Sequence, residues 1–406
     1  MSTPIWNAQQ AAALSEVAAW LADPSALQVY RLFGYAGTGK TTLARHLAMS
    51  CRVPMFAAFT GKAALVLREM GCPNATTLHS LLYNVRDRDR LKLLDLEREL
   101  AKLDPSHRDY REMSAEVALE RDKVKRPWFY VNEESRLRHA DLLVCDEVSM
   151  VDARIGKDME SFGKKILVLG DPAQLPPVGG GGYFTNCKPD TLLTEIHRQA
   201  ADNPVLRWAT MARRGEVIPF GDEGAAKKFR RDRVADDWIA KEAGQVLVGK
   251  NDTRRDLNKR IRKVLGRTSI FPTHKDVLVI LQNDHRLGLL NGSIVMNMNE
   301  ALHEPETDPN IFWTSLIHKV DGTTQIIRDL KCDARPFLGQ EPGTDRSALQ
   351  IDYGYALTVH KAQGSQWETV TLYDDGFAKR ETETRRRWLY TAITRAQKSL
   401  NIITSA

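Results

Sequence analysis

The stretch GYAGTGKT, residues 34–41, constrains the fold more than any other part of the chain. It follows the apolar run Val29–Phe33, which is typical of a strand, and it opens a helical segment from Thr41. Glycines at this spacing let backbone N–H groups approach phosphate oxygens, and a helix N-terminus adds partial positive charge. A chance glycine-rich turn is the alternative, but the strand–loop–helix order favours a phosphate-binding loop in an α/β fold.

Two side chains of this loop have specific expected roles. Lys40 should bridge the β- and γ-phosphates of a nucleoside triphosphate, and the Thr41 hydroxyl should ligate Mg²⁺. The residues that we expect around the nucleotide in this loop are Gly34, Ala36, Gly37, Thr38, Gly39, Lys40 and Thr41. The motif therefore predicts a nucleotide and a magnesium ion as cofactors.

Short apolar runs alternate with helical segments through residues 1–185. A first helix is predicted by apolar residues at i, i+3, i+4, i+7 spacing, namely Leu14, Val17, Ala18 and Leu21. The further runs with strand character are Met55–Phe59, Leu142–Cys145 and Ile166–Leu169. Such alternation predicts a parallel α/β sheet, in which ligands bind at the carboxyl ends of the strands.

A second α/β unit is predicted from residue 186 onward. Its strands are expected at Val246–Val248, Thr369–Leu372 and Leu400–Ile403. Residues 266–347 interrupt it with β-rich runs and turns, which are Val277–Leu281, Ser293–Met296, Asn291-Gly292 and Asp321-Gly322. This pattern predicts a small β-rich insertion.

Residues 84–135 interrupt the first unit in the same way. The stretch RDRDRLKLLDLERELAKLD is highly charged and has leucines near heptad spacing, at Leu93, Leu96, Leu100 and Leu103. It predicts an inserted helical arm that closes with RPWFYVNEES, residues 126–135. The predicted units are therefore 1–83 with 136–185, the insertion 84–135, 186–265 with 348–406, and the insertion 266–347.

Acidic and amide side chains follow two further strands. Asp146, in LLVCDEVSM, ends an apolar strand where Mg²⁺ would lie, and Glu147 is the natural group to polarise an attacking water. Gln174, in LVLGDPAQLPPV, ends another strand, where a neutral amide can sense the γ-phosphate. Acidic pairs also follow strands by chance, but together with the phosphate loop they indicate nucleotide hydrolysis.

Small polar residues follow the second strand and its neighbour. Thr60 and Lys62 lie in AFTGKAALVL, and His79 lies in TTLHSLL. Hydroxyl and amine groups at one sheet edge suit contacts to a phosphodiester backbone, although ordinary surface polarity explains each of them equally well.

The composition limits the class of protein but does not indicate a function. The net charge of +6 and the pI of about 9.0 suit a polyanionic partner or a solvated basic face. The five cysteines form no CxxC pair, which argues against a metal site or a disulfide framework. No signal peptide or apolar membrane span is visible, so we expect a cytoplasmic protein of a bacterium or a phage-infected cell.

Eight motifs in order carry a family resemblance, namely GYAGTGKT, AFTGKAA, ATTLHSLL, CDEVSM, GDPAQLPPV, LTEIHRQ, LTVHKAQGSQW and LYTAITRA. The series resembles superfamily 1 DNA helicases, in particular the RecD-like group that includes the Dda helicases of phages. It covers nearly the whole chain except the arm at 84–126. The resemblance implies two RecA-like domains with ATP in the cleft between them.

The resemblance also implies nucleotide contacts outside the phosphate loop. Asn7 and Gln10 match an adenine-reading motif, and Arg198 and Arg395 match two arginine fingers, for which surface ion pairs are the alternative. Gly364 and Gln366 would face the nucleotide. The family often has glutamate where Gln366 stands, so strict ribose selection is in doubt.

DNA contacts are implied in the same way. Thr358, His360 and Lys361 would touch the strand in the second domain, beside Thr60, Lys62 and His79 in the first. Asn251 and Arg254 match a further DNA-contacting segment, for which a solvated helix start is nearly as good an explanation.

For the insertions, the resemblance implies an SH3-like fold at 266–347 and a strand-separating pin at 84–135. Trp128, Phe129 and Tyr130 are candidates for stacking on the first base pair, or for anchoring the arm.

The resemblance implies an ATP-dependent helicase that moves 5′-to-3′ on single-stranded DNA. A DNA-dependent translocase or loader without unwinding is the alternative. We expect single-stranded DNA and junctions as partners, single-stranded-DNA-binding or replication proteins as candidate protein partners, no membrane, and a monomer.

Overall fold

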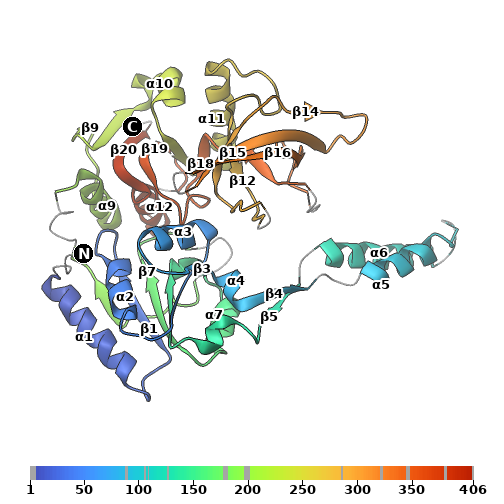
Figure 1. Ribbon diagram of the computed structural model, residues 1–406. Coiled ribbons are helices and arrows are strands. Elements are labelled where there is room, and N and C mark those ends of the chain that lie inside the picture. Colours follow the sequence, from blue (N-terminus) through green and yellow to red (C-terminus); the bar gives the residue numbers. More distant parts are fainter. Residues whose placement is uncertain are drawn as a thin grey trace.

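The computed structural model describes residues 6–86, 90–104, 107, 109–125, 128–176, 182–195, 202–284, 287–320, 323–343, 348–378 and 382–404. Figure 1 shows two α/β halves packed on each other, a β-rich insertion beside the second half, and a helical arm that projects from the first half. Within the described residues, no helix combines the length and apolar character needed to cross a bilayer.

The first half is built on a six-stranded parallel sheet with the order β3-β2-β6-β7-β1-β8. Its strands are β1 (Val29–Gly34), β2 (Pro54–Ala58), β3 (Thr76–Thr77), β6 (Leu142–Asp146), β7 (Lys165–Gly170) and β8 (Thr191–Leu193). The four strands expected from sequence are thus present, with β2 shifted by one residue. Successive side chains of β6 enter opposite cores, because strand side chains alternate between faces.

Helices cover both faces of this sheet. One face packs against α1 (Ala8–Ala22), α2 (Lys40–Ala48) and α3 (Gly61–Glu69). The other packs against α4 (Leu78–Leu82) and α7 (Ala153–Glu160). In α1 the buried face contains Ala13, Val17 and Trp20, whereas Ala18, expected on that face, is exposed. Short 3₁₀ turns lie at Arg136–His139 and Val148–Met150.

The second half repeats the plan with the strand order β18-β11-β19-β20-β10-β9, parallel except for the β9–β10 pair. Its strands are β9 (Gly221–Asp222), β10 (Ala226–Arg230), β11 (Gln245–Val248), β18 (Ala356–Thr358), β19 (Trp367–Asp374) and β20 (Ala396–Thr404). Its helices are α9 (Pro204–Arg214), α10 (Asp236–Lys241), α11 (Asn251–Val264) and α12 (Glu383–Ile393), with a 3₁₀ turn at Arg231–Arg233. Leu175 of the first half joins the core cluster beneath α9 and α12, so the two halves share apolar contact.

The arm leaves the first half through an antiparallel ribbon of β4 (Tyr83–Arg86) and β5 (Trp128–Val131). Beyond the ribbon, α5 (Arg90–Leu100) and α6 (Tyr110–Lys125) lie side by side and extend away from the body (Figure 1). Trp128 and Phe129 belong to β5, where they pair with Arg86 and Val85. These two aromatic residues therefore lie on the ribbon at the root of the arm.

The β-rich insertion is an antiparallel sheet with the order β14-β15-β13-β12-β17, to which β16 adds beside β15. Its strands are β12 (Val277–Ile280), β13 (Ile294–Asn297), β14 (Leu302–His303), β15 (Ile311–Val320), β16 (Thr323–Asp333) and β17 (Ile351–Tyr353). β17 lies beyond residue 347, so this sheet extends into the range expected for the second α/β unit. The turn expected at Asp321-Gly322 lies outside the described residues.

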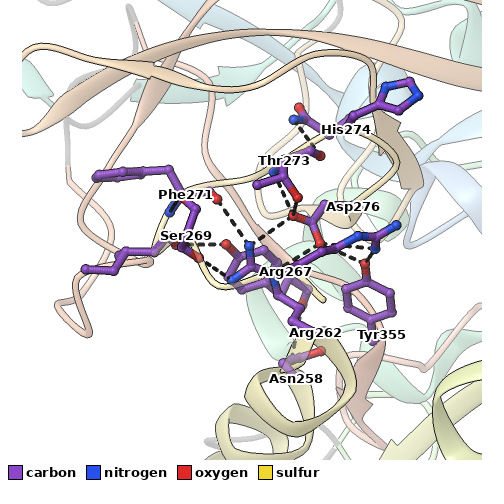
Figure 2. A network of polar contacts seen from close by, with 12 residues as sticks. Asn258, Arg262, Arg267, Ser269, Phe271, Thr273, His274, Asp276 and Tyr355 are labelled. Atoms are coloured by element: carbon purple, nitrogen blue, oxygen red, sulfur yellow. Dashed lines mark hydrogen bonds and ion pairs between the residues drawn. The ribbon is translucent and has the colours of Figure 1, made fainter. Parts of the chain in front are cut away.

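A buried ionic network joins this insertion to α11 (Figure 2). The Asp276 carboxylate, which is fully buried, accepts from Arg262 Nε and Nη2 at 3.1 Å each and from Arg267 Nη1 at 3.3 Å. It also accepts from the Tyr355 hydroxyl at 2.7 Å and the Thr273 backbone N–H at 2.7 Å. Residues just before β12 and just after β17 thus meet at one carboxylate, which fixes both ends of the insertion to the second half.

Candidate functional site

The phosphate loop lies between β1 and α2, as the sequence predicts. Gly37 and Gly39 have φ of 77° and 80°, a left-handed conformation that strongly favours glycine. The Lys40 ammonium folds back onto the loop and donates to the carbonyl oxygens of Gly34 at 2.6 Å and Tyr35 at 3.1 Å. A phosphate group at the N-terminus of α2 would offer this ammonium stronger, charged acceptors.

The acidic pair meets the loop at the carboxyl ends of neighbouring strands. Thr41 Oγ1 donates to Asp146 Oδ2 at 2.8 Å. Burial raises the pKa of the Asp146 carboxyl, the charge of Glu147 raises it further, and the Thr41 hydrogen bond and Lys40 oppose both effects. A buried carboxylate next to a second one gains most from a bound cation. One hydroxyl and two carboxylates are oxygen donors that fit Mg²⁺ shared with nucleotide phosphates.

Glu147 is held in an unusual conformation. Its φ and ψ are 54° and 44°, in the left-handed region that residues other than glycine rarely adopt. Such strain persists where the surroundings enforce it, and it is frequent at functional sites. Here it occurs directly after the strand that ends at Asp146.

A chain of contacts links Glu147 to the second half through Gln174. With the Gln174 amide oriented to satisfy its neighbours, its nitrogen lies 3.2 Å from Glu147 Oε2 and its oxygen lies 3.3 Å from Arg395 Nη2. Gln174 and Arg395 are both buried. The side chain expected to sense the γ-phosphate therefore connects the Glu147 carboxylate to a guanidinium from the other half of the molecule.

The Arg395 guanidinium is positioned mainly by neutral oxygens. It donates to the Thr391 carbonyl at 3.1 Å, the Ser365 carbonyl at 3.3 Å and Thr394 Oγ1 at 3.2 Å. These contacts fix its orientation but do not neutralise its charge, so the cation is available to an anion in the cleft. Arg198, the second expected arginine finger, lies outside the described residues.

Asn7 and Gln10, expected to read adenine, are engaged with each other. Asn7 Oδ1 accepts from the Gln10 N–H at 2.7 Å, and Gln10 Oε1 accepts from the Asn7 N–H at 3.1 Å, which together cap α1. Gln10 Nε2 donates to the Thr38 carbonyl at 2.9 Å and is buried. In this arrangement Gln10 braces the phosphate loop, and adenine contact by the pair stays a prediction.

Four of the expected DNA-contacting residues line one cavity of about 810 Å³, namely Asn251, Thr358, His360 and Lys361. Burial and the charge of Arg254 lower the pKa of Lys361. The rest of the lining is Leu175, Pro176, Gly249, Phe377, Glu383, Thr384 and Arg387. Sequence motifs did not single out Phe377 and Arg387, because both lie outside the eight motif strings.

The first-half residues expected to touch DNA lie apart from this cavity. Thr60 caps α3 through the Ala63 N–H at 3.2 Å, and its hydroxyl leaves no room for a side chain at Gly364. The Lys62 ammonium lies 4.4 Å from the centre of the Trp367 ring, and burial lowers its pKa to about 8. Thr60 and Lys62 therefore contact second-half residues across the interface between the two halves, called the seam below.

Three further residues predicted to bind DNA or nucleotide contact other protein side chains in the structure. His79 lies between the Phe59 and Tyr83 rings at the root of the arm. Arg254 is buried, and its Nη1 donates to Asp352 Oδ2 at 2.6 Å, so the guanidinium that was expected at a DNA surface makes an internal ion pair. Gln366 is exposed and accepts from Gln397 Nε2 at 3.2 Å.

Two protein-family models match the sequence of this chain. A family model described as AAA domain matches residues 6–235, more than half of the 406 residues, and one described as UvrD-like helicase C-terminal domain matches residues 353–403. The chain is 29% identical over 276 residues to the ATP-dependent RecD2 DNA helicase of Deinococcus radiodurans. The chain belongs to the AAA-domain family, and its sequence is similar to RecD-like superfamily 1 helicases.

The RecD-like relatives are longer than the chain. The match to the Deinococcus protein covers 63% of this chain and 35% of that protein. The RecBCD enzyme subunit RecD of Mycobacterium tuberculosis is 26% identical over 424 aligned positions, covering 92% of this chain and 66% of that subunit. The chain thus spans 35% of the length of one of these two relatives and 66% of the other.

Solved Pif1 helicase structures share the fold of this RecD-like chain. One, from work on unwinding of forked duplex DNA by two coordinating Pif1 helicases, has a TM-score of 0.55 at 17% identity and covers 100% of this chain and 92% of that one. The Bacteroides Pif1 complex with ADP-AlF3 and single-stranded DNA has a TM-score of 0.54 at 18% identity, covering 98% and 92%. These likenesses establish two RecA-like α/β halves with parallel sheets.

Proposed function

We propose that the protein is an ATP-dependent DNA helicase that translocates 5′-to-3′ on single-stranded DNA and separates duplex strands. The observation that carries the proposal is the chain from Glu147 through Gln174 to Arg395, which joins the hydrolytic site of one half to the other half. Any change at the γ-phosphate alters the fit of the two halves, and this is the coupling that a motor requires.

ATP would bind between the two halves, with its phosphates on residues 34–41. Thr41 and Asp146, whose side chains already meet, would hold Mg²⁺, and the ion would supply positive charge to the phosphates. Glu147 orients the attacking water through its carboxylate. Arg395 stabilises the transferring phosphoryl group, and such a cation typically contributes about 10³- to 10⁵-fold in rate. Arg198, Gly364, Gln366, Asn7 and Gln10 complete the proposed nucleotide site.

DNA binds across the carboxyl ends of the two sheets. The second-half cavity with Thr358, His360 and Lys361 holds one part of the strand, and cationic and hydroxyl groups suit its phosphates. Thr60 and Lys62 contact Gly364 and Trp367 of the second half, so DNA contact by these two residues requires the halves to separate. DNA contact by Arg254 requires its ion pair with Asp352, within the second half, to open. For His79, which lies between two aromatic rings of the first half, DNA contact is proposed from the motif alone.

The insertions have distinct proposed roles. The β-rich insertion corresponds to an SH3-like module that lies beside the DNA path, and the arm with its ribbon supplies the strand-separating pin. Anchoring of the arm remains the competing role for Trp128 and Phe129. We propose α/β units at 1–83 with 136–193 and at 194–265 with 354–406, because β8 pairs in the first sheet and β17 pairs in the insertion sheet. We also propose a monomeric motor, and single-stranded-DNA-binding or replication proteins as partners.

The names of similar proteins are consistent with this assignment. The Deinococcus relative is named an ATP-dependent DNA helicase, and a fold neighbour was solved with single-stranded DNA. We therefore infer ATP and single-stranded DNA as the ligands of this chain.

The decisive test is ATP-dependent strand separation on two matched duplexes, one with a 5′ single-stranded tail and one with a 3′ tail. Unwinding of only the 5′-tailed duplex is expected. Unwinding of only the 3′-tailed duplex would keep the motor and contradict the polarity. Unwinding of neither, with ATPase still stimulated by single-stranded DNA, would favour a translocase or loader.

Lys40→Ala is the matched control for this test. Loss of the ammonium removes the cation that meets the β- and γ-phosphates, so ATP hydrolysis and unwinding should both disappear. ATPase activity near that of the parent protein would contradict the assignment of residues 34–41.

A further inference from the structure

The Tyr390 hydroxyl of α12 lies between two groups of the first half. It accepts a hydrogen bond from the Ala36 backbone N–H at 2.7 Å and donates one to Asp171 Oδ2 at 2.6 Å. Tyr390 is 1% exposed and Asp171 is 5% exposed, so water does not compete for these bonds. One phenol thus bridges the seam between the halves with both of its hydrogen-bonding functions in use.

Both partners belong to the nucleotide machinery. Ala36 lies in the loop whose backbone N–H groups are aimed at phosphate oxygens, four residues before Lys40. Asp171 directly follows β7 and begins the turn that ends at Gln174, and it also accepts from the Ala173 N–H at 3.0 Å. The hydroxyl therefore ties the phosphate loop to the segment that carries the γ-phosphate-sensing amide.

The direction of the two bonds is fixed. Burial and the Asp171 charge raise the pKa of Tyr390 well above its usual value, so the phenol keeps its proton and donates it to the carboxylate. The oxygen lone pair is then left for the Ala36 N–H. A phenylalanine at this position would keep the ring but leave a buried carboxylate oxygen and the half-buried Ala36 N–H each short of one partner.

The neighbouring residues of the second half hold the same turn. Thr391 Oγ1 accepts from the Leu175 N–H at 2.9 Å, and Gln363 Nε2 donates to the Leu175 carbonyl at 2.8 Å. Arg395, which follows α12 within two residues, contacts Gln174 of that turn. Tyr390 and Thr391 of α12 thus bond Asp171 and Leu175 at the two ends of this turn, and Gln363 and Arg395 add contacts to Leu175 and Gln174.

We propose that Tyr390 is a positioning residue that sets the register between the phosphate loop, the Asp171–Leu175 turn and Arg395. A displacement of Ala36 by the γ-phosphate is transmitted through the hydroxyl to α12, and the same bond brings Arg395 and Gln174 into line for hydrolysis. This inference rests on the proposed ATPase motor and assigns to it a contact that its sequence motifs do not identify.

The test is Tyr390→Phe, assayed for ATP hydrolysis with and without single-stranded DNA. Removal of one hydroxyl that aligns the reacting groups should lower kcat by about 10- to 100-fold while KM for ATP changes less than about threefold, because alignment acts in the transition state. Tyr353→Phe is the matched control: its buried hydroxyl donates to the Ile270 carbonyl at 2.8 Å in the β insertion, so kcat should stay near that of the parent.

A double-mutant cycle with Asp171→Asn separates positioning from general stabilisation. If the two side chains act through their shared bond, Tyr390→Phe combined with Asp171→Asn should lose little more kcat than the more damaging single change. Additive losses would overturn the proposal. So would unchanged kcat in Tyr390→Phe with only a lowered melting temperature, since that result describes a purely structural bond.

The failure of this inference can be told from failure of the proposed function. If the parent protein hydrolyses ATP in response to single-stranded DNA and Tyr390→Phe matches it, the inference alone fails. If the parent shows no ATPase under any condition, both fail together.

Discussion

The arm leaves the first half through one two-stranded ribbon. The β insertion, in contrast, enters and leaves the second half at a buried ionic network, and Val279 of its strand β12 belongs to the second-half core. At the root of the arm, the Tyr83 hydroxyl donates to Asp158 at 2.5 Å and Ser135 Oγ donates to the Leu81 carbonyl at 2.5 Å. At the root of the insertion, one buried carboxylate gathers two guanidinium groups, a phenol and a backbone N–H.

The two kinds of attachment determine whether each insertion moves rigidly with the half that carries it. A segment clamped by a buried ion network moves with the half that holds it, because breaking such a network leaves uncompensated charge in the interior. A segment held by a ribbon and a few hydrogen bonds can be altered without unfolding its host. We therefore infer that the β insertion is a rigid part of the second half, and that the arm is an accessory attached to the first.

The largest expected effect comes from removing the centre of the clamp. Asp276→Ala leaves the buried charge of Arg262 and the half-buried charge of Arg267 without their carboxylate, so we expect a loss of about 3–5 kcal/mol in unfolding free energy. Urea denaturation of the full chain measures it. Asp232→Ala is the control, since it breaks an exposed pair with Arg230 and should cost at most about 1 kcal/mol. Equal losses of unfolding free energy in the two variants would show that the ionic network does not hold the β insertion more firmly than an exposed ion pair would.

The next effect concerns the ribbon aromatics. Truncating Trp128 and Phe129 to alanine should reduce strand separation about tenfold or more while leaving translocation and ATPase intact, because stacking on a base is worth about 1–3 kcal/mol. Unwinding of a 5′-tailed duplex and DNA-stimulated ATPase are measured on the same preparation. If both activities and the melting temperature fall together, these residues anchor the arm and do not separate strands.

A smaller effect is expected from the hydrogen bond at the arm root. Tyr83→Phe removes the donor to Asp158 but keeps the ring against Arg154, and it should cost about 1–2 kcal/mol of unfolding free energy. The same change at Tyr30, whose hydroxyl lies 2.7 Å from Thr191 Oγ1 on the far side of the sheet, is a matched comparison. A loss as large as that of Asp276→Ala would mean that the arm root is also a clamp.

Sequence reasoning correctly located the elements that depend on neighbours in the chain. The strand, loop and helix around Lys40, and the strand that ends at Asp146, are local features whose order already indicates the phosphate site. The alternation of apolar runs likewise predicts two parallel sheets, because strands buried on both faces read as continuous apolar segments.

Contacts between distant residues could not be predicted in this way. Gln10 binds a carbonyl 28 positions away, and Arg254 pairs with a carboxylate 98 positions away, so motif matching gave neither partner. Lys62 meets Trp367 for the same reason. A motif marks residues of one site, but which of them touch ligand and which brace the fold depends on side-chain geometry between the two halves.

The smallest effect on stability should come from the largest deletion. Replacing residues 87–127 by Asn-Gly would close β4 and β5 as a two-residue hairpin, since Arg86 pairs with Trp128 in the present register. The helices α5 and α6 pack on each other and project from the body (Figure 1), so the unfolding free energy should change by less than about 1 kcal/mol, a typical surface effect. DNA-stimulated ATPase should stay within about twofold of the parent. Retained unwinding would assign strand separation to the ribbon, lost unwinding would assign it to the helices, and a collapse of the fold like that expected for Asp276→Ala would show that both insertions are integral to their halves.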